Sequence, residues 1–224
     1  MPATEYSELL FHVKCTITDY HKDQSGATRT TDILGTFTNL AAAKNAAYGA
    51  LASEGYVKDD FQSYEVKNDT DPEQWAHGDG VLVFAKAPAG QEFEVSLDTK
   101  PNDLKLKGNA SGEVEDYLHY VLQTMIDYNS DRIGGIQTTE VEGIYPTRKA
   151  AFEAAKTALL HEEVTKESFA EYDEKDKFVD EWPYGDECWV HAVSQTGENF
   201  MVFVKAQPNK HRHHEGKASR RQEV

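Results

Sequence analysis

The amino-acid sequence repeats itself once along the chain. Identities recur at an offset of 108 positions in the first part of the repeat and, after the loss of one residue, at an offset of 107. They keep the same order throughout, so chance is a poor explanation, and a repeat of this length indicates two copies of one structural unit. The matched pairs include Asp19-Tyr20 with Asp127-Tyr128, Gly35 with Gly143, Ala46-Ala47 with Ala154-Ala155, Leu51 with Leu159, Trp75 with Trp182, and Pro101-Asn102 with Pro208-Asn209.

The repeat sets the expected domain boundaries. We expect a first repeat unit over residues 1–102 and a second over 117–209, each of an ordinary size for a domain. Residues 103–116 contain Lys-Gly-Asn-Ala-Ser-Gly, a composition typical of a flexible or turning linker. Residues 210–224 are polar and basic, and we expect them to form a disordered tail.

Hydrophobic periodicity predicts four strands in each unit. Residues 10–20 alternate apolar and polar side chains, which favours a strand with one face on a core. The equivalent residues 118–128 are more apolar, as in a strand that is buried on both faces. A second strand follows a polar loop, and a hairpin around a glycine ends the unit. These further strands are predicted at 31–37, 81–87 and 93–97 in the first copy, and at 139–145, 188–194 and 200–204 in the second.

One main helix is predicted in each unit, directly after the second strand. N-cap residues at Thr38-Asn39 and Pro146-Thr147 precede alanine-rich runs, which have high intrinsic helix propensity. Gly55 is suited to end the first helix in a left-handed conformation. Small residues on the inner face allow close approach to a sheet and leave little room for a ligand beneath. The aromatic residues that follow, Phe61 and Tyr64 with their counterparts Phe169 and Tyr172, are expected in a short helix or an irregular segment.

These elements define the expected fold class. We predict an α+β protein made by internal duplication of a β-β-α-β-β unit, with antiparallel sheets that each carry one main helix. The two copies are expected in a pseudo-two-fold arrangement, like the subunits of a symmetric dimer. Whether they share one sheet or pack face to face is left open.

Charge limits the choice of partners. The net charge is −16, and the last fifteen residues hold five Lys or Arg against two Glu, so the rest of the chain carries −19. Such an acidic body repels phosphate, which argues against nucleic acid as a partner. The charge favours solubility or a basic partner, so a protein partner or self-association remains open.

The remaining composition fits a soluble intracellular chain. No run approaches the about 20 apolar residues of a membrane helix, and the first twenty residues do not resemble a secretory signal. We therefore predict a cytoplasmic location and no membrane contact. Cys15 and Cys188 occupy non-equivalent positions of the repeat and are interpreted as buried free thiols, with a reactive role as the alternative.

The most specific repeated cluster surrounds two tryptophans. Trp75-Ala76-His77-Gly78-Asp79 corresponds to Trp182-Pro183-Tyr184-Gly185-Asp186. The simpler interpretation is a turn into the hairpin, in which glycine supplies a positive φ, aspartate accepts backbone amides and tryptophan fills the edge of the core. The functional interpretation is a binding surface made by Trp75, His77, Trp182 and Tyr184, because Trp and Tyr are enriched at binding hot spots.

A second candidate site lies at the end of the first strand of each copy. Asp19-Tyr20 and Asp127-Tyr128 are interpreted either as strand ends whose aspartates bind loop amides or as paired groups in a cleft between the copies. In the second case, two like-charged carboxylates would raise one pKa and serve as acid and base.

Signals for catalysis and for cofactors are missing. The sequence has no Gly-x-Gly-x-x-Gly, P-loop, Gly-x-Ser-x-Gly or zinc-ligand spacing, and its histidines are scattered outside a His-Arg-His-His run in the tail. We therefore predict no cofactor and no metal. The favoured hypothesis is a non-enzymatic interaction module, the alternative is a small-molecule-binding protein or enzyme with a site between the repeats, and a structural or filament-forming role is a third possibility.

Overall fold

The computed structural model describes residues 6–68, 75–175 and 182–208. The chain forms two compact units. Of the described residues, unit 1 contains 6–21, 29–68, 75–117 and 207–208, and unit 2 contains 22–28, 118–175 and 182–206. The predicted tail, residues 210–224, lies outside the described residues.

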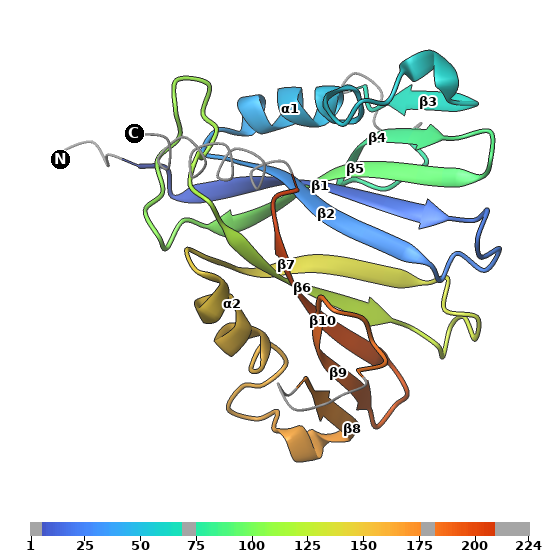
Figure 1. Cartoon of the computed structure of the whole chain (residues 1–224), viewed down its shortest axis with the longest axis vertical. Helices are drawn as coiled ribbons and strands as arrows, with labels where there is room; N and C mark the ends of the chain where they lie inside the picture. Colours follow the sequence, from blue (N-terminus) through green and yellow to red (C-terminus); the bar gives the residue numbers. More distant parts are fainter. Residues whose placement is uncertain (1–5, 69–74, 176–181, 209–224) are drawn as a thin grey trace, which may run out of the picture. The chain divides into compact units, whose positions relative to one another are not determined.

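Unit 1 is an antiparallel sheet of five strands with a helix on one face (Figure 1). The strands lie in the order β2-β1-β5-β4-β3, and every neighbouring pair is antiparallel. A 3-10 turn at Lys58–Asp60 leads into β3. The elements are β1 (Leu9–Asp19), β2 (Arg29–Phe37), α1 (Leu40–Ser53), β3 (Ser63–Val66), β4 (Val81–Lys86) and β5 (Gln91–Pro101).

Unit 2 has the same element order and the same strand order, β7-β6-β10-β9-β8. A 3-10 turn at Lys166–Ser168 precedes β8, as its counterpart precedes β3. The chain is therefore an α+β protein with two antiparallel five-stranded sheets. The elements are β6 (His119–Ile126), β7 (Gln137–Tyr145), α2 (Arg148–Ala155), β8 (Phe169–Glu174), β9 (Cys188–Ser194) and β10 (Asn199–Ala206).

Each sheet has one strand more than the four predicted. The additional strands, β3 and β8, contain the aromatic residues that were expected in a short helix or an irregular segment. Both are edge strands with a single neighbour, β4 or β9. A four- or six-residue strand at an edge gives little alternation to detect, so its pairing partner rather than its own sequence makes it a strand.

The core of unit 1 lies between α1 and the sheet. Asn39 caps the helix by accepting the Ala42 amide at 3.1 Å, and Gly55 ends it at φ +93°, as predicted. Ala43 and Ala47 are fully buried, so their small side chains bring the helix close to the strands. The strand residues beneath include Val13, Cys15, Val83, Ala85, Phe93 and Val95.

The helix of unit 2 is shorter but packs in the same way. Thr147 caps α2 through its bond from the Ala150 amide, and Ala151 and Ala155 are fully buried. After Ala155 the chain continues with hydrogen bonds between residues three apart, such as Thr157 N–H to Ala154 O. This tighter winding still buries Leu159, the counterpart of Leu51.

The opposite faces of the two sheets differ. Alternation along β1 turns His12 and Lys14 away from α1, and His12 is buried with its Nδ1 2.9 Å from Thr36 Oγ1. On β6 the equivalent residues are Tyr120 and Leu122, which are also buried. The prediction that residues 118–128 are more deeply buried is confirmed for residues 118–122, all of which are buried.

The segment expected to join the copies is tightly turned where the structure describes it. Val114 is fully buried and its amide donates to Thr36 O, while the Thr38 amide donates to Gly112 O. A Cβ at Gly108 would lie 2.4 Å from Thr38 Oγ1, so glycine is required for this close approach.

Candidate functional site

The two tryptophan clusters form turns that lead into a hairpin strand. Gly78 and Gly185 have φ values of +88° and +87°, a conformation that favours glycine, so the turn prediction is confirmed. The Val81 amide donates to Gly78 O, and the Cys188 amide donates to Gly185 O. The two turns therefore have the same backbone geometry, although only about half of their residues are identical.

A lysine from the neighbouring strand end fixes each turn. Lys67 Nζ donates to the backbone oxygen of Asp79 at 2.7 Å, and Lys175 Nζ donates to that of Asp186 at 2.8 Å. The carboxylates, which were expected to accept backbone amides, point into solvent instead and lie 3.6 and 3.7 Å from the same ammonium groups. The aspartate main chain, rather than its side chain, thus holds the turn.

In unit 1 three rings stack behind the turn. The Trp75 ring meets His77 edge-on at 4.8 Å, and His77 stacks on Phe84 of β4 at 3.9 Å with an interplanar angle of 8°. His77 Nε2 lies 3.1 Å from a carboxylate oxygen of Glu65 on β3. Backbone pairing places Glu65 opposite Phe84, so the edge strand positions the carboxylate against the stack.

Unit 2 builds the same stack with different rings. Trp182 meets Tyr184 edge-on at 5.0 Å, and Tyr184 stacks on His191 at 4.0 Å. The Tyr184 hydroxyl donates to Asp173 Oδ2 at 3.2 Å. Asp173 pairs with His191 across β8 and β9, the register that Glu65 and Phe84 have in unit 1. The central polar ring, histidine or tyrosine, is bonded to an edge-strand carboxylate in both units.

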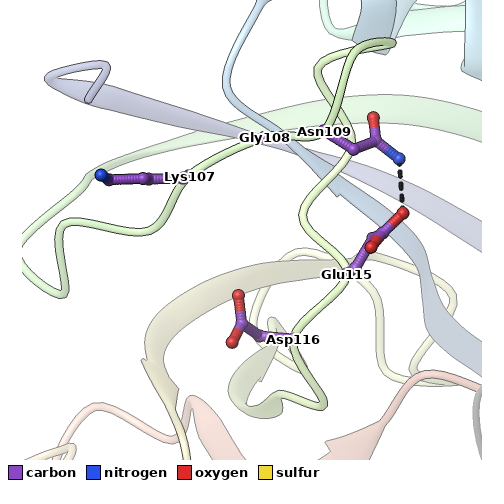
Figure 2. Close-up of a pocket in the computed structure, with 5 residues that line it drawn as sticks. All are labelled: Lys107, Gly108, Asn109, Glu115 and Asp116. Atoms are coloured by element: carbon purple, nitrogen blue, oxygen red, sulfur yellow. Dashed lines mark hydrogen bonds between the residues drawn. The ribbon is translucent and has the colours of Figure 1, made fainter. Parts of the chain in front are cut away.

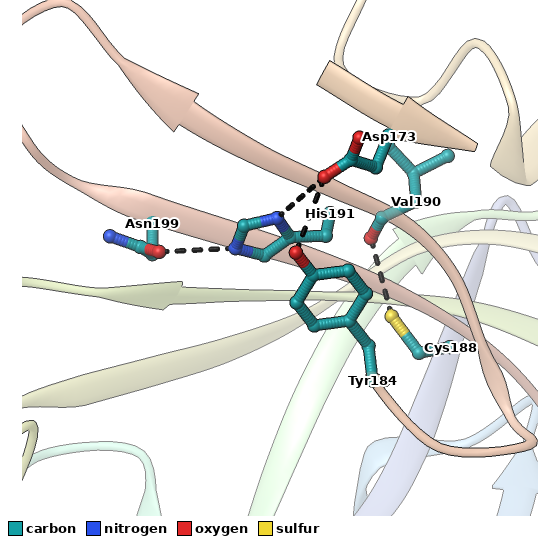
Figure 3. Close-up of polar contacts among 6 residues, drawn as sticks. All are labelled: Asp173, Tyr184, Cys188, Val190, His191 and Asn199. Atoms are coloured by element: carbon teal, nitrogen blue, oxygen red, sulfur yellow. Dashed lines mark hydrogen bonds and ion pairs between the residues drawn. The ribbon is translucent and has the colours of Figure 1, made fainter. Parts of the chain in front are cut away.

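The His191 ring in the unit 2 stack has a polar contact on each side (Figure 3). Its Nε2 lies 3.1 Å from Asn199 Oδ1, and its Nδ1 lies 3.5 Å from Asp173 Oδ2. The second contact has the distance of an ion pair but not the geometry of a hydrogen bond. Burial, together with the negative charge of Asp173, raises the pKa of the Tyr184 hydroxyl. Tyr184 therefore stays protonated and remains a donor.

Both tryptophans leave a polar atom unsatisfied. The indole Nε1 of Trp75 and that of Trp182 are buried, and neither finds a hydrogen-bond acceptor among the described residues. A buried donor without a partner costs about 1–3 kcal/mol. The same unsatisfied donor occurs at equivalent positions of two units, so it belongs to the shared design of the turn.

The second candidate site is divided between the units. Asp19 and Tyr20 belong to unit 1, where Asp19 is the last residue of β1 and pairs with Gln91 of β5. Asp127 and Tyr128 belong to unit 2, where Tyr128 is exposed and its ring lies over Gly134.

Asp127 is engaged by its own loop. Its carboxylate accepts the amides of Asn129 and Ser130, both at 3.0 Å, and the hydroxyl of Ser130 at 2.7 Å. These bonds hold the pKa of Asp127 below its usual range, the direction opposite to that needed by a general acid. The interpretation as a strand end with loop-binding aspartate is thus confirmed for Asp127.

A hollow in unit 1 offers little to a small molecule (Figure 2). It is open to solvent, has a volume of about 380 Å³ and is lined by Lys107, Gly108, Asn109, Glu115 and Asp116. All five residues belong to one loop, and Asn109 Nδ2 donates to Glu115 at 2.9 Å. Ligand pockets are mostly apolar with a few polar groups, and this lining has no large apolar side chain.

The cysteines are buried free thiols, as predicted. Burial raises the pKa of Cys15 to about 12 and that of Cys188 to about 11, so neither forms the thiolate that a nucleophile or a metal ligand needs. Within residues 6–68, 75–175 and 182–208, no three His, Cys, Asp or Glu side chains gather as metal ligands. No helix in those ranges is both long and apolar enough to cross a bilayer.

Several members of the stacks were not singled out from the sequence. Phe84 and Glu65 in unit 1, with His191 and Asp173 in unit 2, lie nine or ten residues from the tryptophans, on the strands that flank each turn, and are not identical between the copies. Lys67 and Lys175 do match at offset 108, so the repeat itself carried a signal for the lysine that fixes each turn.

Comparison of the chain with protein-family models, with curated proteins and with solved structures gives no match.

Proposed function

We propose that the chain is a non-enzymatic binding protein, built by tandem duplication of one α+β module in a pseudo-two-fold arrangement. The binding surfaces are the turns around Trp75 and His77 in unit 1 and around Trp182 and Tyr184 in unit 2. The observation that carries the proposal is the aromatic stack that is built twice with a buried indole N–H for which the described residues offer no acceptor. A turn with only a structural role would not be expected to keep a buried N–H donor, with its free-energy cost, at the equivalent position of both units.

The construction of the turns supports a recognition role. Each stack is held by a carboxylate on the edge strand and each turn by a lysine, so the rings are fixed before any partner arrives. Preorganised aromatic side chains bind with little loss of conformational entropy.

Ring substitutions at the turns test this function. Trp182→Ala should abolish association in a quantitative capture and sizing experiment, whereas Trp182→Phe keeps an apolar ring and should weaken association by less than about tenfold. The matched control is Trp189→Phe, because Trp189 stacks on Phe152 of α2 and is not part of the Trp182 stack. Its ring lies 5.6 Å from Lys175 Nζ, and phenylalanine keeps an aromatic face for that contact. Unchanged association of folded Trp75→Ala and Trp182→Ala proteins would refute the proposal.

A further inference from the structure

The outer strand of the unit 2 sheet has a free edge. β8 (Phe169–Glu174) pairs only with β9, and on its outer side no described residue bonds to its backbone. An unpaired strand edge presents a row of amide and carbonyl groups that another strand can join.

The register identifies the backbone groups that point outward. The Lys175 amide donates to Trp189 O, so Asp173, two residues earlier, also turns its backbone groups toward β9. Alternate residues of an antiparallel strand face opposite sides, and Tyr172 and Glu174 therefore present their N–H and C=O groups at the free edge. Two such residues provide up to four main-chain hydrogen bonds to an added strand.

The side chains along this edge are acidic. Glu171 and Asp173 are exposed on the sheet face opposite the helix, where Tyr184 also lies, bonded to Asp173. On the other face, Glu174 is paired with Lys166 at 2.7 Å. An added strand thus meets two exposed acidic side chains on one face, of which Asp173 is also bonded to Tyr184, and a neutralised pair on the other.

We propose that the β8 edge binds a basic, extended peptide segment of another protein as an additional antiparallel strand. Lys or Arg at alternate positions of the peptide lie opposite Glu171 and Asp173, where opposite charges on neighbouring strands stabilise the pair. Main-chain bonds give the affinity and the alternating charge gives the specificity, as in other cases of strand addition. This inference names the partner class of the turn around Trp182 and so rests on the proposed function.

Charge also argues against a second copy of the chain as the occupant. Two β8 strands paired edge to edge would bring Glu171 and Asp173 of one copy against the same residues of the other. Like charges opposite one another destabilise a sheet. The net charge of −16 adds long-range repulsion between copies and attraction for a basic segment.

Unit 1 supplies the matched comparison. Its edge strand β3 (Ser63–Val66) has four residues instead of six and a single acidic side chain, Glu65, which is bonded to His77. The register of β3 turns the backbone of Val66 outward, as that of β8 turns Glu174 outward. Val66 is therefore the counterpart of Glu174 at an edge that lacks the paired charges.

The test uses the full chain and a synthetic ten-residue peptide of alternating Lys and Val with blocked ends. Glu174→Pro removes an outward amide without breaking a bond to β9, and it should weaken peptide binding at least about tenfold in fluorescence anisotropy. Val66→Pro should leave the affinity unchanged. Hydrogen exchange should show peptide-dependent protection of the Tyr172 and Glu174 amides.

A charge reversal provides a second, independent variant. Glu171→Lys should weaken binding of the Lys–Val peptide by about tenfold and improve binding of a Glu–Val peptide, with both effects reduced at high salt. Circular dichroism checks that each variant is folded. The proposal is overturned if the Lys–Val peptide does not bind at millimolar concentration, if Glu174→Pro and Glu171→Lys bind it like the parent, or if exchange protection falls outside β8.

Trp182→Ala separates this inference from the proposed function. Loss of peptide binding in both Trp182→Ala and Glu174→Pro supports the two together. Loss in Glu174→Pro alone supports strand addition at β8 and refutes a role of the tryptophan turn in that binding.

Discussion

The two units share one scaffold but differ on the sheet face opposite the helix. On the helix side, both bury paired alanines and a leucine, with equivalent capping residues and equivalent bulges in the first strand pair. On the opposite face, Lys14 and Asp98 of unit 1 form a 3.8 Å ion pair, whereas their counterparts in unit 2 are Leu122 and Lys205. The close approach of the helix allows only small side chains between helix and sheet, so both units use alanine there. The other face of the sheet accepts either charged or apolar side chains.

The aromatic stacks show a different kind of agreement. Unit 1 places histidine at the centre and phenylalanine beneath it, and unit 2 places tyrosine at the centre and histidine beneath it. The shared feature is a polar ring that bonds an edge-strand carboxylate. Geometry and hydrogen bonding are thus retained where residue identity is not.

The largest expected effect comes from exchanging Leu122 of unit 2 and its counterpart Lys14 of unit 1, which lie on the sheet faces opposite the helices. Leu122→Lys places a charge at a position where the native side chain is 1% exposed, and it should destabilise the chain by about 4 kcal/mol or more. The reciprocal Lys14→Leu removes the 3.8 Å ion pair with Asp98 and should change stability by only about 1 kcal/mol. Urea unfolding measures both, and equal costs would contradict the contrast between the faces.

The next effect concerns pH and distinguishes His12 from its counterpart Tyr120. Burial lowers the pKa of His12 from 6.5 to about 4, so as pH falls the unfolded chain takes up the proton first. Stability attributable to His12 is complete above pH 6.5 and is lost between pH 6.5 and about 4, by up to roughly 3 kcal/mol.

Replacement of His12 isolates its contribution to the pH dependence of the free energy of unfolding. His12→Asn keeps a polar atom near Thr36 but does not titrate, and its stability should fall less over the same pH range. Unfolding free energies at pH 7, 6, 5 and 4 provide the comparison. Parallel curves for parent and variant would mean that His12 takes up its proton as readily in the folded chain as in the unfolded chain.

A smaller effect is expected at the glycines of the first strand pair. A Cβ at Gly35 would lie 2.8 Å from the buried Phe37 ring, and one at Gly143 would lie 2.6 Å from the hydroxyl of the half-buried Tyr145. Gly35→Ala should cost about 2 kcal/mol, because the Phe37 ring cannot move aside. Gly143→Ala should cost less than about 1 kcal/mol, because the end of the tyrosine can swing toward solvent. Thermal unfolding tests the order, and the reverse order would show that Tyr145 is the more rigid ring.

The smallest effect should be equal in the two units. Lys67→Met and Lys175→Met each remove the bond from an ammonium group to a turn carbonyl and a weak ion pair with the same aspartate, while keeping most of the apolar stem. The contact of the Lys175 ammonium with the Trp189 ring is replaced by a contact between the methionine sulfur and that ring. Each should cost about 1 kcal/mol, and the double variant about twice that, because the bonds are separate. A clear difference between the single variants would break the equivalence of the turns.

The local elements could be predicted from sequence to a useful degree. The N-caps at Asn39 and Thr147, the end of α1 at Gly55 and the glycine turns at Gly78 and Gly185 depend on side-chain and backbone chemistry within a few residues. The repeat also identified equivalent turns correctly. The edge strands β3 and β8 were missed because a short strand is defined by its neighbour, which lies about twenty residues away along the chain.

The candidate site was predictable only in part. Trp75, His77, Trp182 and Tyr184 do come together as pairs, because they are two residues apart on a turn that glycine specifies. Asp173 and His191 join them only through the pairing of β8 with β9. Asp127 was found at its expected place, but the loop that it binds lowers its pKa.

By itself the sequence determined the helix caps, the hairpins and the tryptophan turns, because each follows from short-range chemistry and hydrophobic period. Tertiary structure alone decided the fifth strand of each sheet, the carboxylate that holds each stack, the burial of His12 and the free edge at β8. These features depend on which distant segments lie side by side. Packing of those segments decides which groups are buried, which find hydrogen-bond partners and which stay exposed to water.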